Sequence, residues 1–212
     1  MALDGPYTVD DLLAMTGHKP KAAPKWLVGP ASLPAGATEL KDGRHGGRRY
    51  PAKDLRLLGV DPGTLRVGWG VVRRGAKDGA LTLVECGCIR PSPKLDLKAR
   101  LCEIFAELEG VILRLKPDAA ALEETFAGVN MKSAIAMGEG RGIALLCLAR
   151  AKLEVLEISP RSIKQAVTGS GASGKPRVAA MVCAQLGLKV APKPEDVTDA
   201  LAAAIALGRR VG

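Results

Sequence analysis

The stretch LLGVDPGTLRVGWGVV, residues 57–72, decides the fold class of this chain. It overlaps the apolar run LRLLGV, residues 55–60, which is typical of a strand buried on both faces. The run stops at Asp61, where the sequence Asp-Pro-Gly predicts a turn. A second apolar run at residues 67–74 predicts the next strand, and the glycines around this hairpin allow close backbone approach. We therefore expect a buried strand that carries Asp61 to one edge of a sheet.

The chain beyond residue 74 alternates between strand and helix patterns. Residues 80–89 predict a third strand, and residues 95–117 carry one apolar stripe at helical spacing. The further expected elements are strands at 118–124 and 153–159, helices at 130–152, 160–169 and 175–188, and a last helix that contains Asp196 and Asp199. This order predicts an α/β fold with a mixed sheet.

Length and composition favour a soluble cytoplasmic protein. A chain of 212 residues suits one domain, or one domain with a small appendage. No apolar run approaches the ~20 residues that span a bilayer, so we expect no membrane partner. The N-terminal sequence MALDGPYTVDD is acidic, unlike a signal peptide. The five cysteines lie in apolar segments far along the chain from both histidines, so reduced thiols are expected rather than a Cys/His metal site.

The net charge of +9 fits a protein that binds polyanions, and its distribution is more informative than its size. No acid occurs between Ile158 and Ala191. The basic residues of that segment are Arg161, Lys164, Lys175, Arg177 and Lys189. The segment then runs directly into Glu195, Asp196 and Asp199. Basic side chains beside a carboxylate cluster are what a metal-dependent phosphodiesterase requires.

Carboxylates from three separate segments are expected at one edge of the sheet. Asp61 ends the first strand, and Glu123 and Glu124 end the fourth. Ligands in such folds gather at the carboxyl ends of strands. Asp196 and Asp199 lie three residues apart, so on a helix they project from the same side. Each acid also has a plain structural explanation, as a turn residue, a solvated strand end or a partner of the helix dipole.

Such a cluster of carboxylates predicts bound cations, since the like charges would otherwise repel one another. Oxygen-only ligation suits Mg²⁺ or Mn²⁺. Two such ions activate a water molecule and stabilise the leaving oxygen in a phosphoryl displacement. The sequence therefore predicts a hydrolytic metal site.

Five motifs follow one another along about residues 56–210: LLGVDPGTLRVGWGVV, ALEETF, NMKSAIAMGEGRG, VTGSGASGKPRVAAMV and EDVTDALAAAIAL. In these motifs and their order the chain resembles the RuvC family of bacterial Holliday junction resolvases. It implies a ribonuclease H-like fold for residues 55–212, with a mixed five-stranded sheet flanked by helices. It also implies a homodimeric, Mg²⁺-dependent endonuclease that resolves four-way DNA junctions by symmetric paired nicks.

The resemblance also assigns the catalytic acids. They fall on Asp61, Glu123, Asp196 and Asp199, which are then the ligands of two Mg²⁺ ions per subunit, with Mn²⁺ as a substitute. Glu124 is a departure, because the family commonly has an amide there, and its extra charge could change the metal affinity.

DNA-binding residues follow from the same resemblance. Lys164 and Lys175 match the family's DNA-contacting lysines, and Lys175 is expected to stabilise charge at the scissile phosphate. Phe126 matches an aromatic residue after the second acid and is expected to stack on a base of an opened junction. Arg177 and Lys132 are expected to contact DNA as well. Branch-migration motor proteins, found beside the family's bacterial members, are further candidate partners.

Two other functions remain open at this point. One is a different ribonuclease H-like nuclease of the RNA-processing type, and the other is a non-catalytic junction-binding protein. The long acid-free basic segment and the last helix favour the resolvase over the RNA-processing enzyme. The presence of acids at all four positions favours an enzyme over a binding protein.

Residues 1–54 form an N-terminal extension rich in Pro, Gly, Lys and Arg. The sequences YTVDDLLAMTG and GGRRYPAKDL resemble the small helix-turn-helix of MerR and excisionase-type DNA-binding proteins. Pro20 and Pro24 interrupt the helix that would read DNA, so a disordered basic extension or a mis-assigned start codon is the alternative. In a folded module, the residues that would meet phosphates are Arg44, Arg48 and Arg49.

Deleting residues 1–54 is expected to flatten the salt dependence of DNA binding, because each neutralised phosphate adds about 0.9 to the slope of log affinity against log salt. Fluorescence anisotropy with a labelled DNA at several salt concentrations measures this slope. An unchanged slope would reject a DNA-binding role for the extension.

Overall fold

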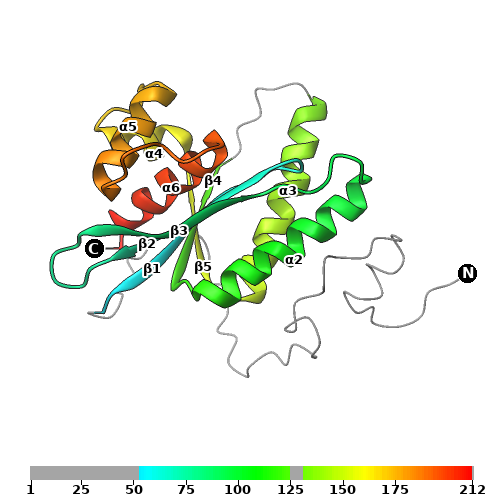
Figure 1. The fold of residues 1–212 in the computed structure, drawn as a ribbon, viewed down its shortest axis with the longest axis horizontal. Helices are drawn as coiled ribbons and strands as arrows, with labels where there is room; N and C mark the ends of the chain where they lie inside the picture. Colours follow the sequence, from blue (N-terminus) through cyan, green and yellow to red (C-terminus); the bar gives the residue numbers. More distant parts are fainter. Residues whose placement is uncertain (1–52, 125–130, 212) are drawn as a thin grey trace, which may run out of the picture. The chain divides into compact units, whose positions relative to one another are not determined.

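The computed structural model of the chain describes residues 53–124 and 131–211, and the side chains of residues 131–133 are outside this description (Figure 1). The expected helix-turn-helix, with Arg44, Arg48 and Arg49, lies outside the described residues. Phe126 and the side chain of Lys132 lie outside them as well. The predictions made for these residues stay predictions.

A mixed five-stranded sheet forms the centre of the described part, with strand order β3-β2-β1-β4-β5. The strands are β1 (Leu55–Asp61), β2 (Val67–Arg74), β3 (Leu81–Ile89), β4 (Ala119–Glu123) and β5 (Glu154–Ile158). β1, β2 and β3 form an antiparallel meander, whereas β4 runs parallel to β1 and β5 runs parallel to β4. The mixed ribonuclease H-like sheet expected from the sequence is confirmed.

Five helices flank the sheet in the described part of the chain: α2 (Leu97–Leu115), α3 (Met131–Arg150), α4 (Pro160–Thr168), α5 (Lys175–Leu186) and α6 (Glu195–Gly208). Local sequence explains several of their ends. The Asp96 side chain caps α2 by accepting from the Ala99 amide, and Ser159 caps α4 in the same way. None of the helices in these ranges is long and apolar enough to cross a membrane.

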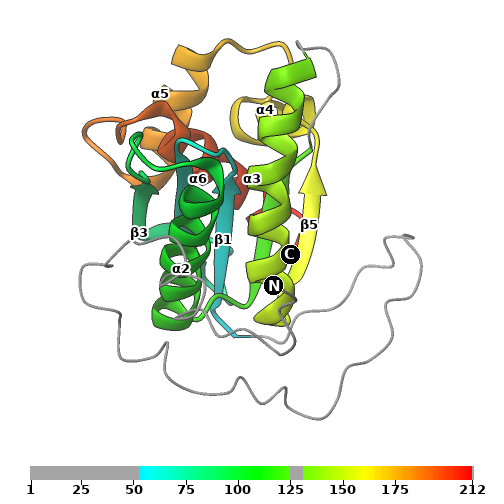
Figure 2. The same ribbon diagram turned by 90° about the vertical axis from the view of Figure 1, so that its right-hand side faces the viewer.

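The helices lie in two layers, one on each face of the sheet. Figure 2 shows α2 and α3 side by side in front of the strands, while α4, α5 and α6 lie behind them. β1 supplies both cores, because its side chains alternate between the faces. Leu57 packs with α6, and Leu58 packs with α2 and α3; both are fully buried. The prediction that the first strand is buried on both faces is therefore confirmed.

Helix α6 lies unusually close to β1 and β2. A Cβ atom added to Gly59 would lie 1.9 Å from the carbonyl oxygen of Ala200. One added to Gly68 would lie 2.0 Å from the carbonyl oxygen of Asp196. Both distances are impossible for real atoms, so glycine at these positions permits the contact between helix and sheet. The packing also brings the first turn of α6 onto the edge where β1 ends.

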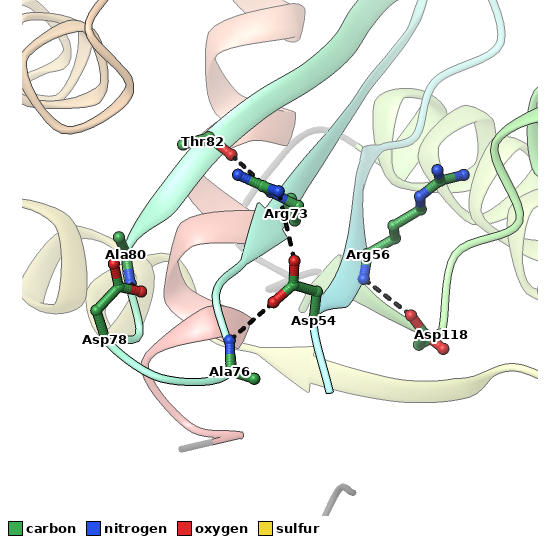
Figure 3. Close-up of polar contacts among 8 residues, drawn as sticks. All are labelled: Asp54, Arg56, Arg73, Ala76, Asp78, Ala80, Thr82 and Asp118. Carbon is green, nitrogen blue, oxygen red and sulfur yellow. Dashed lines mark hydrogen bonds and ion pairs between the residues drawn. The ribbon is translucent and has the colours of Figure 1, made fainter. Parts of the chain in front are cut away.

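At the opposite ends of the strands, away from Asp61 and Glu123, polar contacts hold the sheet together (Figure 3). The Arg56 amide donates to the Asp118 carboxylate at 2.9 Å, which ties the start of β1 to the start of β4. The Asp54 carboxylate accepts from the Ala76 amide at 3.0 Å and lies 3.4 Å from Arg73. The sequence analysis places Asp54 in the N-terminal extension, yet its side chain contacts Ala76 and Arg73 of the sheet domain. These contacts help to fix the register of β1, which sets the position of its far end.

Gly59→Ala is expected to destabilise the fold by about 3 kcal/mol, because the added methyl group forces α6 away from β1. Urea denaturation followed by circular dichroism measures the change. Gly142→Ala, at an exposed position of α3, is the matched control and is expected to stabilise the helix by up to about 1 kcal/mol. Equal effects of the two substitutions would contradict the close packing of α6.

Candidate active site

The edge formed by the carboxyl ends of β1 and β4 gathers the acids that the sequence singled out. Asp61 is the last residue of β1, and Glu123 is the last residue of β4. The strands are parallel neighbours with Val60 beside Leu122, so their terminal acids emerge from adjacent positions. Asp61 also pairs with Gly68 across β1 and β2, and Gly68 abuts the backbone of Asp196. The first turns of α6 thus bring Asp196 and Asp199 to the same edge.

Asp61 lies at the electrostatic centre of this cluster. Burial, together with the negative charges of Asp199, Glu123 and Asp196, raises the pKa of its carboxyl to about 7. Lys175 acts in the opposite direction. The same physics raises the pKa of Glu123 and of Asp199, again with burial as the largest cause. The four acids therefore belong to one electrostatic cluster, although they come from three separate segments.

Two lysines face the acids from α4 and α5. The Lys175 Nζ atom lies 3.1 Å from a Glu195 carboxylate oxygen and 3.6 Å from one of Asp199. The hydrogen bond to Glu195 and the charge of Asp199 raise the pKa of Lys175. Lys164 stands near enough to Glu123 to lower the pKa of that carboxyl, though less than burial raises it. Positive charge therefore balances part of the negative charge in the site.

Two of the acids, Glu123 and Asp199, and both lysines line a small cleft of about 150 Å³. Its lining residues are Glu123, Pro160, Ile163, Lys164, Lys175, Val178, Asp199 and Ala202. A wider, more open groove of about 580 Å³ adjoins it and shares Pro160 and Lys164. Arg161, Gly171 and Ala172 also line the groove. Together the two hollows form a basic path that leads to the carboxylates.

The donor set fits a hard divalent cation. Every candidate ligand is a carboxylate oxygen, which suits Mg²⁺ or Mn²⁺. Within the described ranges, no three Asp, Glu, His or Cys side chains already surround a single point closely enough to hold an ion. Repulsion between the carboxylates adds to the effect of burial in raising the pKa of Asp61, and a bound cation would reduce this repulsion. The roles of these acids as metal ligands stay predictions.

Two predicted residues are less involved in the cleft than the acids and lysines. Arg177 is exposed in the first turn of α5 and is not among the residues lining the cleft. The Glu124 amide donates to the Ile158 carbonyl at 2.9 Å, which continues the pairing of β4 with β5. Glu124 is not one of the acids that raise the pKa of Asp61.

Three residues that sequence reasoning did not assign also contact the site. Arg66, from the turn after β1, forms an ion pair with Asp196 at 3.4 Å. Glu195 holds Lys175, as described above. Arg141, on α3, donates a hydrogen bond of 2.7 Å to the backbone oxygen of Glu123. Arg66 and Arg141 lie in two of the motifs that carry the family resemblance, but nothing in those motifs identified the contacts of either arginine.

The fold and the site define a class of protein: a metal-dependent nuclease of the ribonuclease H-like superfamily, with acids on β1, β4 and the last helix. Residues 57–207 match the family model for crossover junction endodeoxyribonuclease RuvC. The chain belongs to this family.

Relatives with known names agree with this assignment. The chain is 44% identical over 151 residues to the crossover junction endodeoxyribonuclease RuvC of Chloroflexus aggregans, covering 71% of this chain and 91% of the relative. It is 46% identical over 145 residues to that of Chlorobaculum parvum, covering 68% and 76% respectively.

Solved structures agree as well. T. thermophilus RuvC in complex with a Holliday junction substrate matches with a TM-score of 0.66 and 35% identity, covering 72% of this chain and 92% of that chain. The yeast mitochondrial Holliday junction resolvase Ydc2 matches with a TM-score of 0.55 and 14% identity, covering 77% and 82% of the two chains. At that identity the yeast match supports the fold alone.

The metal-free protein is expected to lose stability as the pH rises from 3.8 to about 7. Folded Asp61 keeps its proton over this range while the unfolded chain releases it, so ionisation favours unfolding until the folded carboxyl also ionises. Asp61→Asn removes this loss, and its melting temperature should exceed that of the wild type increasingly across the window. Scanning calorimetry in EDTA at several pH values checks this. A difference that stays constant over the window would contradict the raised pKa.

Proposed function

We propose that the protein is a Mg²⁺-dependent endonuclease that resolves four-way DNA junctions by symmetric paired nicks, with residues 55–212 as its nuclease domain. One observation carries the proposal: four acids from β1, β4 and α6 interact at a single sheet edge, with Lys164 and Lys175 beside them. Membership of the RuvC family supports it, as does the match to a T. thermophilus relative described in complex with a Holliday junction substrate.

The carboxylates of Asp61, Glu123, Asp196 and Asp199 would hold two Mg²⁺ ions. When bound, the ions activate a water molecule and stabilise the leaving oxygen of the phosphodiester. Asp61 is central among these acids, because the charges of the other three all raise the pKa of its carboxyl. Pro62 directly after it limits the freedom of the chain at this point.

The lysines would bind and orient the substrate backbone. Lys175 is held between Glu195 and Asp199, at the mouth of the cleft, where it can meet the scissile phosphate and stabilise charge that develops there. Lys164 lines both hollows, so it suits a neighbouring phosphate of the same strand. Arg161 borders the wider groove and extends the basic path away from the acids.

Paired nicks need two active sites, which is why we propose a homodimer in which each subunit cuts one strand. Phe126, Lys132 and Arg177 are the further residues that would contact the opened junction. Association with branch-migration motor proteins and a cytoplasmic location stay predictions.

Cleavage of a labelled mobile four-way junction in Mg²⁺ tests the proposal. Wild type is expected to make symmetric nicks in the junction and to spare linear duplex and an RNA hairpin. Asp61→Asn and Asp199→Asn should each lower the rate by about 100-fold or more while junction binding persists, because they remove ligands from the ions. Asp78→Asn, in the turn between β2 and β3, is the matched control and should cut normally.

Two outcomes would contradict the proposal. Tight junction binding without cleavage in Mg²⁺ or Mn²⁺ would indicate a binding protein. Cleavage of the RNA hairpin in preference to the junction would indicate an RNA-processing nuclease.

A further inference from the structure

Arg141, a largely buried residue of α3, connects this helix to the end of β4. The Arg141 side chain is 15% exposed, and its Nη1 atom donates to the backbone oxygen of Glu123 at 2.7 Å. Its Nη2 atom forms an ion pair with the carboxylate of Glu157 on β5. A buried guanidinium needs such partners, since an unpaired charge away from water is costly. Arg141 therefore ties α3 to the last residue of β4 and to the neighbouring strand.

Gly140, the residue before Arg141, lies against the turn that follows β1. Gly140 is buried, and a Cβ atom added to it would lie 2.6 Å from the carbonyl carbon of Gly63 and 2.7 Å from its oxygen. Gly63 lies two residues after Asp61, in the turn that leaves β1. At Gly142, also on α3, an added Cβ atom would meet no described atom within 4 Å. The need for glycine is therefore specific to the contact with the turn.

We propose that Gly140 and Arg141 are positioning residues that set the spacing between Asp61 and Glu123. Of these adjacent residues of α3, Gly140 lies against Gly63 in the turn after Asp61, and Arg141 donates a hydrogen bond to the backbone oxygen of Glu123. This inference rests on the proposed metal-dependent function, because a fixed spacing matters only if both carboxylates serve one site.

The position of the acids explains why positioning residues are needed. Glu123 forms the last residue pair of β4 with β5, and one further hydrogen bond, from the Glu124 amide to the Ile158 carbonyl, continues their pairing. Repulsion between the carboxylates pushes the two strand ends apart. Metal ligands must be held to within about 0.5 Å for tight binding, and neither residue contacts an ion itself. Gly140 and Arg141 act only through the acids that they position.

Metal binding is the direct test of this role. Gly140→Ala and Arg141→Met are expected to weaken Mn²⁺ binding in calorimetry without DNA, and to raise the Mg²⁺ concentration that gives half-maximal junction cleavage, by about 10-fold or more. Arg141→Lys, which retains a single cationic donor, should recover part of the loss. Gly142→Ala is the matched control for the glycine and should stay within about twofold of wild type. Glu157→Gln removes the ion pair but keeps the bond to Glu123, so it should lower the melting temperature and leave metal binding nearly unchanged.

The results separate this inference from the proposed function. If wild type cuts the junction and both Gly140→Ala and Arg141→Met bind Mn²⁺ as tightly as Gly142→Ala, the positioning role is wrong and the nuclease function stands. If wild type binds Mn²⁺ but cuts no junction, the function is wrong, and weaker binding in the variants still supports the positioning role. If the two variants do not fold, as judged by circular dichroism, Arg141→Lys decides: metal affinity equal to wild type would overturn the inference.

Discussion

The contact between α6 and the bare backbone of β1 and β2 is the constraint on which the site depends. Gly59 and Gly68 have no side chains to separate the helix from the sheet, and the face of α6 that packs against them consists largely of alanine. The atom that meets Gly68 is the carbonyl oxygen of Asp196, so packing of the core and placement of an acid are one and the same contact. Because hydrophobic burial stabilises this arrangement, the fold can hold acidic side chains near one another against their repulsion.

That repulsion is only partly balanced within the described residues. Lys175 and Arg66 supply positive charge beside Asp199 and Asp196, but both side chains are more than half exposed, where water screens their charge. Asp61 is the acid most affected, because it is half-buried and senses all three of the others. In the proposed nuclease, a divalent cation bound by these acids would offset their repulsion.

Much of this could be predicted from the sequence, because the decisive features are periodic or local. The apolar run before Asp61 indicates a buried strand that ends at this acid. The three-residue spacing of Asp196 and Asp199 indicates a helix that presents both acids on one side. Packing partners are different: Gly140 and Gly142 stand in the same GEGRG sequence, and nothing local distinguishes the glycine that meets Gly63 from the one that meets open space. The contacts of Arg66, Glu195 and Arg141 likewise could not be predicted locally, because their partners come from other segments that the fold brings beside them. The roles of the N-terminal extension and of Phe126 stay predictions.

Anomalous diffraction from crystals of the protein grown with Mn²⁺ tests the central claim most directly, because it locates the ions without relying on activity. If the acids are gathered to hold cations, two anomalous peaks should lie about 3.5–4 Å apart, with Asp61 between them and Glu123 and Asp199 in contact. Fully occupied Mn²⁺ elsewhere in the molecule, with no peak at the ends of β1 and β4, would contradict the claim that this sheet edge is the catalytic site.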